Sequence, residues 1–434
     1  MISRMLLTNS RFPGEISRQW GRLLDSLRSS LYVSSLYLIG TNIVNAAFGF
    51  LFWAGAAHLY APREVGLVAA AVSAIGLLAM VSTLGLDYAM IRFLPHAENP
   101  QGIINSSLTI GGGAALVLSV IFVEGAGIWS PVLRPSPASL VFVTALVLGT
   151  VLTTILGLLD SIFLTRKRTN LVLAQSSVFG ATKVVSAVVL VGVGRPIGLI
   201  GAWVLGLVAA VGCGLAVFLP RVEKRKHQLR LAVSRAVVND MTHFAFANYI
   251  STVLWSAPTF LLPLLVAHMA GSEANAYFYV ALSISGLLSV IPAAVSLSLF
   301  AHGSRDENEL TRLTLASLRF SLGLLILAVG TMFMFGGKLL LLFGRAYSVQ
   351  ATKLLWVLAL SAIPVTVNSL YFSVRRVQNR MDQVLIFMGL ILAVSLGLSF
   401  VLLPRIGLIG VGVAWLIAQG FVAVWIAGLY LLRL

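Results

Sequence analysis

A lysine and an aspartate have the strongest potential for chemistry in this sequence, because both fall inside long apolar stretches. Lys183 lies within the run 171–193, and Asp160 lies near the end of the run 138–163. An ionisable group at membrane depth is costly unless it faces water, a partner or a ligand. In a helix that starts near Leu171, Lys183 is about 18–20 Å from one membrane face, so its side chain would have to stretch to reach either face. We expect Lys183 to attract a pyrophosphate or an acidic sugar, or else to form a structural pair within the N-terminal half.

Other charged residues could gate or brace such a site. Asp160 precedes Arg166 by six residues, so the aspartate could act in gating, couple to a cation, or pair with Lys167. Asp87 and Arg92 bracket the end of another apolar run, and a hinge or loop-anchoring ion pair is the simpler interpretation of these two residues.

Polar side chains inside further apolar runs could hydrogen-bond a sugar. Asn42 and Asn45 lie in the first run, Asn248 and Trp255 in the seventh, and Asn368 in the tenth. The alternative for all of them is polar packing between helices, worth about 1–2 kcal/mol or less for each contact.

The rest of the sequence argues against covalent chemistry. One cysteine and six scattered histidines form no cluster with metal-ligand spacing, and phosphate-binding GxxxxGK[ST] and GxSxG motifs are absent. We therefore expect no metal, no cofactor and no enzyme activity. With 59% hydrophobic and 10% charged residues, the chain is too apolar for a soluble domain.

Twelve apolar stretches are long enough to cross a membrane as helices. They lie near 34–59, 65–86, 102–124, 138–163, 171–193, 198–219, 244–269, 276–300, 315–336, 351–373, 383–403 and 408–431. The predicted fold is therefore an all-α polytopic membrane protein with short loops.

The positive charge indicates orientation. The N-terminal segment, the even-numbered loops and the tail carry 22 Lys and Arg, against six in the opposite loops. This excess predicts that the chain lies in the cell (inner) membrane with both termini on the cytoplasmic side. The net charge of +16 then faces anionic inner-leaflet lipid and not nucleic acid. Residues 14–31 place Leu and Trp opposite Arg on a helical wheel, which predicts a helix on the membrane surface.

The sequence contains an internal repeat. IGLIG occurs at 197–201 and 406–410, an offset of 209, and AVSAIGLL at 71–78 aligns with ALSISGLL at 281–288, an offset of 210. Each half has six spans, so the halves should be related by a pseudo-two-fold axis along the membrane normal. The predicted parts are an N-terminal segment (1–33), an N-lobe (34–219), a basic linker (220–243) and a C-lobe (244–434).

With these features in view, the chain resembles the polysaccharide (O-antigen type) flippases of the multidrug/oligosaccharidyl-lipid/polysaccharide exporter superfamily. The resemblance rests on AAHLYAPREVGLVAAAVS (56–73), LGLDYAMIRFLP (84–95), DSIFLTRKRTN (160–170) and IGLIGAW (197–203). It implies a V of two lobes around a cavity, which moves an undecaprenyl-type lipid-linked oligosaccharide to the outer leaflet. In that role the chain would serve polysaccharide or lipopolysaccharide biosynthesis, beside a polymerase or other assembly enzymes.

Two other functions remain open. A drug or small-solute antiporter of the same fold is disfavoured, since the first and seventh helices contain no acidic residue for ion coupling. A non-transporting component of polysaccharide assembly is disfavoured because it would not need a lysine in mid-membrane. A major-facilitator carrier also has two six-helix halves, but GxxxDRxGRR is absent after the second helix.

Overall fold

The protein folds as a bundle of long helices, and no strand occurs in the part of the chain that the computed structural model describes. The described residues are 30–129, 140–193, 196–223, 230, 235–303 and 310–431. The predicted surface helix (14–31) lies almost wholly outside them, as do residues 224–229 and 231–234 of the predicted linker (220–243).

The first half of the chain forms helices α2 to α10. Their bounds are α2 Ser30–Leu59, α3 Pro62–Ser82, α4 Leu86–Phe93, α5 Pro100–Glu124, α6 Ala126–Trp129, α7 Leu140–Thr165, α8 Thr169–Val189, α9 Ile197–Cys213 and α10 Leu219–Val222, with short non-α turns after α4, α8 and α9.

The second half forms α11 to α16. Their bounds are α11 Arg235–Gly286, α12 Val290–Gly303, α13 Leu310–Leu341, α14 Arg345–Val377, α15 Met381–Ile406 and α16 Leu408–Leu431.

The structure confirms the predicted spans. Eleven helices in the described ranges are long and apolar enough to cross a membrane, and one of them covers 53 residues, 248–300. At 1.5 Å per residue that stretch would be about 80 Å long, against about 30 Å of hydrocarbon. It breaks at Gly271, whose φ of 87° lies outside the helical region. The stretch therefore supplies two crossings, which makes twelve.

Prolines in the second half of the chain occupy two kinds of position in the helices. Pro258 and Pro263 lie inside α11, and Pro364 lies inside α14. Pro292, by contrast, is the third residue of α12, just after the short turn 287–289. In the first turn of a helix a missing N–H costs little. Pro292 thus marks a helix start and not a kink within a continuous helix.

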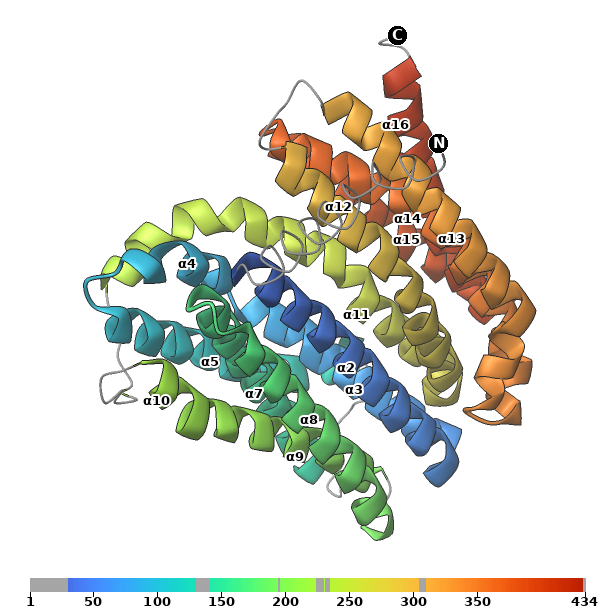
Figure 1. Ribbon diagram of the computed structural model, residues 1–434. Coiled ribbons are helices and arrows are strands. Elements are labelled where there is room, and N and C mark those ends of the chain that lie inside the picture. Colours follow the sequence, from blue (N-terminus) through green and yellow to red (C-terminus); the bar gives the residue numbers. More distant parts are fainter. Residues whose placement is uncertain are drawn as a thin grey trace, which may run out of the picture.

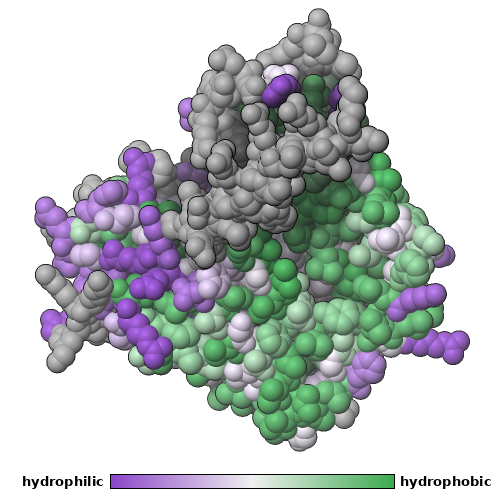
Figure 2. All heavy atoms as spheres, in the orientation of Figure 1, coloured by the Kyte–Doolittle hydropathy of each residue, from purple (hydrophilic) through white to green (hydrophobic). Residues whose placement is uncertain are grey.

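The helices form two groups, which we call the N-terminal bundle (α2–α10) and the C-terminal bundle (α11–α16). In Figure 1 the two bundles diverge toward the upper left, where α12 lies apart from α4 although α11 runs beside α4, and they approach each other toward the lower right. The loops that follow α4, α7 and α14 lie at the separated end, which we call the basic end; the loops after α2 and α8 lie at the opposite end. Figure 2 shows hydrophilic residues gathered around α4 and α10, with apolar residues over the body of the molecule.

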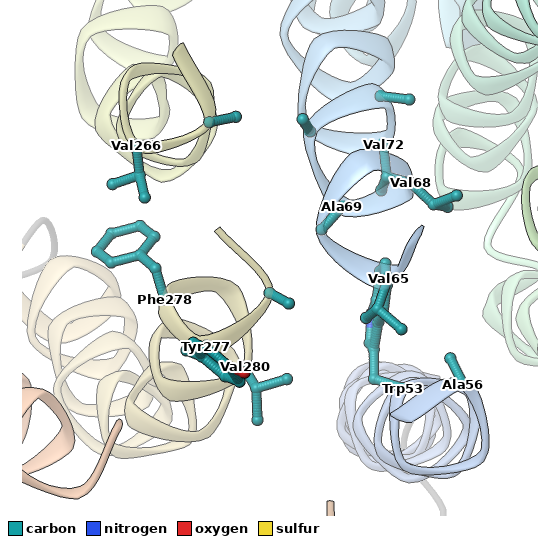
Figure 3. Packing of buried hydrophobic residues seen from close by; sticks show 14 of the residues in the cluster. Trp53, Ala56, Val65, Val68, Ala69, Val72, Val266, Tyr277, Phe278 and Val280 are labelled. Carbon is teal, nitrogen blue, oxygen red and sulfur yellow. The ribbon is translucent and has the colours of Figure 1, made fainter. Parts of the chain in front are cut away.

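One hydrophobic core joins the bundles. It includes Trp53 and Val65 of the N-terminal bundle together with Val266 and Phe278 of the C-terminal bundle. Figure 3 shows these side chains on α2, α3 and the two parts of α11, with Val266 and Phe278 pointing toward one another. The core therefore spans the seam between the bundles.

The seam between α3 and α11 is closed along its length. At the opposite end, Asn275 Nδ2 donates to the Gly66 carbonyl at 2.8 Å. At the basic end, Tyr249 Oη donates to the Val81 carbonyl at 2.8 Å. Between these points a Cβ on Gly76 would collide with the ring of Phe260. The part of α11 before the break at Gly271 runs antiparallel to α3, and Asn275 follows shortly after this break. The two helices therefore remain in contact from one end of the seam to the other.

Candidate functional site

A cavity of about 250 Å³ lies within the N-terminal bundle, between α2, α7 and α8. Its lining consists of Asn45, Leu156, Asp160, Gln175, Ser176, Phe179 and Lys183. The structure thus brings together three residues that the sequence singled out separately: Lys183, Asp160 and Asn45. Asn45 is itself exposed, so the lining reaches the surface of α2.

Three aromatic rings surround the amine of Lys183. The Nζ atom is 4.4 Å from the ring centre of Phe179, 4.6 Å from that of Trp203 and 5.6 Å from that of Phe52. A cation over the face of an aromatic ring is attracted by the ring's quadrupole, more strongly where water is excluded. The side chain is only 4% exposed. The rings therefore partly compensate a cation that has no ion-pair partner among the described residues.

Two further lining residues carry buried polar atoms without a hydrogen-bond partner in the described chain. They are Asp160, through Oδ1, and Gln175, through both Oε1 and Nε2. Buried polar groups are normally satisfied by protein or ordered water, and an unsatisfied one in a native fold calls for a physical reason. A ligand or water within the cavity would supply the missing bonds.

Close helix packing fixes the geometry of this site. A Cβ on Gly180 would collide with the ring of Phe48, so α8 can approach α2 closely only because the residue is glycine. On the other side of α8, a Cβ on Gly206 would come within 3.0 Å of Lys183 Cβ and of the Phe179 ring. These two glycines allow α2 and α9 to press Lys183 against its aromatic neighbours.

Sequence reasoning missed Gln175 and Phe179, two uncharged members of the site. Gln175 and Phe179 precede Lys183 by eight and four residues, a spacing that places all three on one side of a helix. This periodicity could have identified them. Trp203 and Phe52 come from distant segments, and no local pattern connects them with Lys183.

The other predicted substrate-binding residues lie outside the cavity lining. Asn42 is exposed on α2, and Asn248 is half-buried on α11. The Trp255 ring packs edge-on against Phe372, with ring centres 5.9 Å apart. Asn368 is fully buried and its Nδ2 donates to Oε1 of Gln419 at 2.6 Å and to its backbone carbonyl at 3.0 Å. Asn368 therefore joins α14 to α16, and in this conformation it is not available to a substrate.

The predicted charge pairs turn out differently. Arg166 does form an ion pair, but its partner is Glu223, with Nε and Oε1 2.8 Å apart. Asp87 does not pair with Arg92, whose guanidinium lies 5.6 Å from the ring centre of Phe93. Burial raises the pKa of the Asp87 carboxyl, an effect that backbone hydrogen bonds partly oppose. The suggested pair of Asp160 with Lys167 is also absent from the described residues.

A second cavity, of about 740 Å³, lies at the opposite end of the seam. It is lined by Arg63, Glu64, Leu67, Pro196, Ala270, Gly271, Ser272 and Glu273, which come from both bundles. Glu64 is engaged in the helix start, where Oε2 accepts from the Ala61 amide at 2.9 Å. Glu273 accepts from the Tyr277 hydroxyl at 2.8 Å. In the described residues no group of three or more His, Cys, Asp or Glu could hold a metal ion.

Comparison with known families identifies the class. The profile of the family described as "Polysaccharide biosynthesis protein" matches residues 32–301, well over half of the chain. The chain belongs to this family. A search of curated proteins gives no match.

Solved structures share the fold. The lipid II flippase MurJ in an inward closed conformation has a TM-score of 0.75 at 12% identity, covering 93% of this chain and 88% of that chain. An inward-facing multidrug resistance MATE family transporter of the MOP superfamily has a TM-score of 0.65 at 16% identity, covering 90% and 92%. A MOP superfamily transporter from Pyrococcus furiosus has a TM-score of 0.59 at 15% identity, covering 91% and 93%. The protein therefore has the two-lobe fold of MOP-superfamily transporters.

Proposed function

We propose that this protein flips a lipid-linked oligosaccharide, a polyprenyl-pyrophosphate sugar, from the cytoplasmic to the outer leaflet by alternating access. The observation that carries the proposal is the cavity around Lys183, Asp160 and Gln175 at membrane depth. Lipid contact alone gives no reason to keep a cation, a carboxyl and an amide there without partners. A hydroxyl-rich head group that has to cross the hydrocarbon does give such a reason.

The comparisons support this choice among transporters. The matching family is described by polysaccharide biosynthesis. The MurJ structure, described as a lipid II flippase, superposes with a higher TM-score than the MATE transporter, 0.75 against 0.65. A flippase also suits two bundles that diverge toward one end around a seam of α3 and α11 that stays packed along its length.

The orientation follows from charge. We place both termini in the cytoplasm and the chain in the inner membrane, with the basic end toward anionic lipid. The parts are then the N-terminal segment (1–33), the N-lobe (34–219), the linker (220–243) and the C-lobe (244–434). The pathway would build a surface polysaccharide such as lipopolysaccharide, and a polymerase or another assembly enzyme would receive the product.

A drug or small-solute antiporter is the second candidate, and the MATE transporters among the similar structures favour it. Against it, α2 contains no Asp or Glu, and neither does the stretch 248–270 of α11. Those helices would be expected to carry an ion-coupling acid. Asp160 on α7 lies beside the cavity, but on another helix.

The test is transport by the purified chain in liposomes. A fluorescent polyprenyl-pyrophosphate oligosaccharide is placed in one leaflet, and its accessibility to a quencher from the other side is followed. We expect faster exchange with protein than without it. If the protein accelerates exchange of none of several such glycolipids but dissipates a gradient of a cationic drug, the antiporter is the better account. If the protein moves neither the glycolipids nor the drug, a non-transporting role in polysaccharide assembly is the better account.

A further inference from the structure

The cavity in the N-terminal bundle is built to receive uncharged hydrogen-bonding groups. Gln175 is 1% exposed, and both ends of its amide lack a partner in the described chain. An amide offers two donors and an acceptor with two lone pairs, which a hydroxyl can match because it both donates and accepts. Ser176 and Asn45 add a hydroxyl and a second amide to the same lining. Three uncharged polar side chains thus surround a space in which hydroxyl groups would find partners on several sides.

The charges of the lining balance. Lys183 contributes one cation and Asp160 one carboxyl, and the two form no ion pair although they line the same cavity. Pyrophosphate carries at least two negative charges, and protein sites for such groups gather several Arg or Lys side chains. A carboxyl beside a single amine would repel part of that charge. The cavity therefore does not suit the pyrophosphate of a lipid-linked sugar.

The size of the cavity and the apolar part of its lining suit a single sugar ring. The volume of about 250 Å³ is below the roughly 300–1,000 Å³ of pockets that hold drug-sized molecules. Phe179 and Leu156 form an apolar part of the lining. A pyranose has hydroxyls around its edge and C–H groups on its faces, so it can bond to the polar residues and pack a face on the aromatic ring.

From these three features we propose that the cavity binds a single uncharged sugar residue of the transported head group, and that the pyrophosphate binds elsewhere. This rests on the proposed function and specifies which part of the substrate the N-terminal bundle recognises. Gln175, Ser176 and Asn45 hydrogen-bond the hydroxyls, Lys183 donates and Asp160 accepts, and Phe179 packs against the ring.

The experiment measures sugar binding directly, apart from transport. Methyl glycosides of glucose, galactose and N-acetylglucosamine are titrated into the detergent-purified chain and followed by saturation-transfer NMR. We expect saturable binding of at least one of them, weakened about tenfold or more in Gln175→Met and less in Ser176→Ala. Gln350→Met is the control, since Gln350 is an exposed glutamine outside the cavity lining. Excess inorganic pyrophosphate should leave sugar binding unchanged.

Three results would overturn the proposal: no saturable binding of any of the three glycosides, equal binding by Gln175→Met, or displacement of the sugar by pyrophosphate. Because Gln175→Met could disturb packing, Ser176→Ala serves as a second, smaller change, with circular dichroism and melting temperature measured for both variants. Liposome exchange with the same samples separates the two proposals. Exchange without sugar binding leaves the flippase and removes this site, whereas sugar binding without exchange leaves the site and removes the flippase.

Discussion

The Nδ2 atom of Asn275 donates to the backbone carbonyl of Gly66, and the two residues are 209 positions apart, one fewer than the offset of 210 that aligns 71–78 with 281–288. Residues that correspond in two repeats, or lie one position from doing so, can touch only close to the symmetry axis. This hydrogen bond therefore marks the pseudo-two-fold axis at the end of the seam opposite the basic loops. Ser272 lies in the same contact, where its carbonyl occupies the space that a Cβ on Gly66 would need.

The first prediction concerns Gly66. A valine at this position would overlap the Ser272 carbonyl, so the Gly66→Val variant cannot close the seam at this end. We expect it to populate a conformation with the ends of the bundles apart, and to slow glycolipid exchange by about tenfold or more. Spin labels at positions 63 and 345, in a Cys213→Ser background, would report the longer distance. Gly55→Ala is the control, because a Cβ there has open space.

The second prediction concerns Asn275 itself. Asn275 is fully buried, and the Asn275→Ala variant removes the hydrogen bond that α11 donates to the Gly66 carbonyl of α3. Hydrogen bonds between helices in a membrane contribute about 0.6 kcal/mol on average and up to about 1.7 kcal/mol. We expect a slightly lower melting temperature and a larger fraction of molecules with the seam open. An unchanged distance distribution between labels at 63 and 345 would show that packing, and not this bond, holds the seam.

Much of the fold could be predicted from the sequence. A spanning helix needs about 20 apolar residues, and this requirement located all twelve crossings. The break at Gly271 fell between two predicted spans for the same reason, although nothing in the sequence showed that the helices on either side would form one almost continuous element. The repeat gave the division into two bundles, because equal numbers of spans in equal order must fold alike.

The candidate site was only half predictable. Lys183 and Asp160 could be found because an ionisable group inside a membrane span is costly unless it faces water, a partner or a ligand. Asn368 could not be assigned, because a polar residue on an apolar helix bonds equally well to a substrate or to another helix, and its partner Gln419 is 51 residues away. The partner of Arg166 was missed for the same reason, because Glu223 follows 57 residues later, directly after α10. Pairings between distant segments depend on how the helices pack.

The third prediction concerns Asp87, in the short helix α4 outside the membrane spans. Its carboxyl is buried, which raises its pKa above the ordinary value of 3.8. The folded state therefore binds the proton more tightly than the unfolded state does, so the contribution of Asp87 to stability is greatest at low pH and decreases as the pH rises above that value. We expect Asp87→Asn to melt at or above the wild-type temperature at neutral pH, with the difference shrinking toward pH 4. A difference that grows on acidification would contradict this, and would indicate that the ionised carboxylate is stabilised by a cation.

The fourth prediction separates the two interpretations of Lys183. A structural role requires that the amine hold the N-terminal bundle together, so its loss would lower the melting temperature. In a binding role the amine contacts the ligand and does not stabilise the N-terminal bundle, so its loss would weaken binding without lowering the melting temperature. Replacing a buried ion pair with apolar side chains of similar volume is often neutral or stabilising by about 1–4 kcal/mol, and the loss of Lys183 strands no ion-pair partner among the described residues. The three aromatic contacts reduce this gain. We therefore expect Lys183→Met to melt no lower than wild type while glycolipid exchange falls by about tenfold or more, as measured on the same liposomes.

Lys338→Met is the matched control, because the amine of Lys338 also lies over an aromatic ring, 5.6 Å from the centre of Phe335, but outside the cavity. If Lys183→Met melts well below wild type and the control does not, the lysine is a structural element of the N-terminal bundle. If neither melting nor exchange changes, the cavity does not use the amine, and binding would have to rest on Gln175 and its uncharged neighbours.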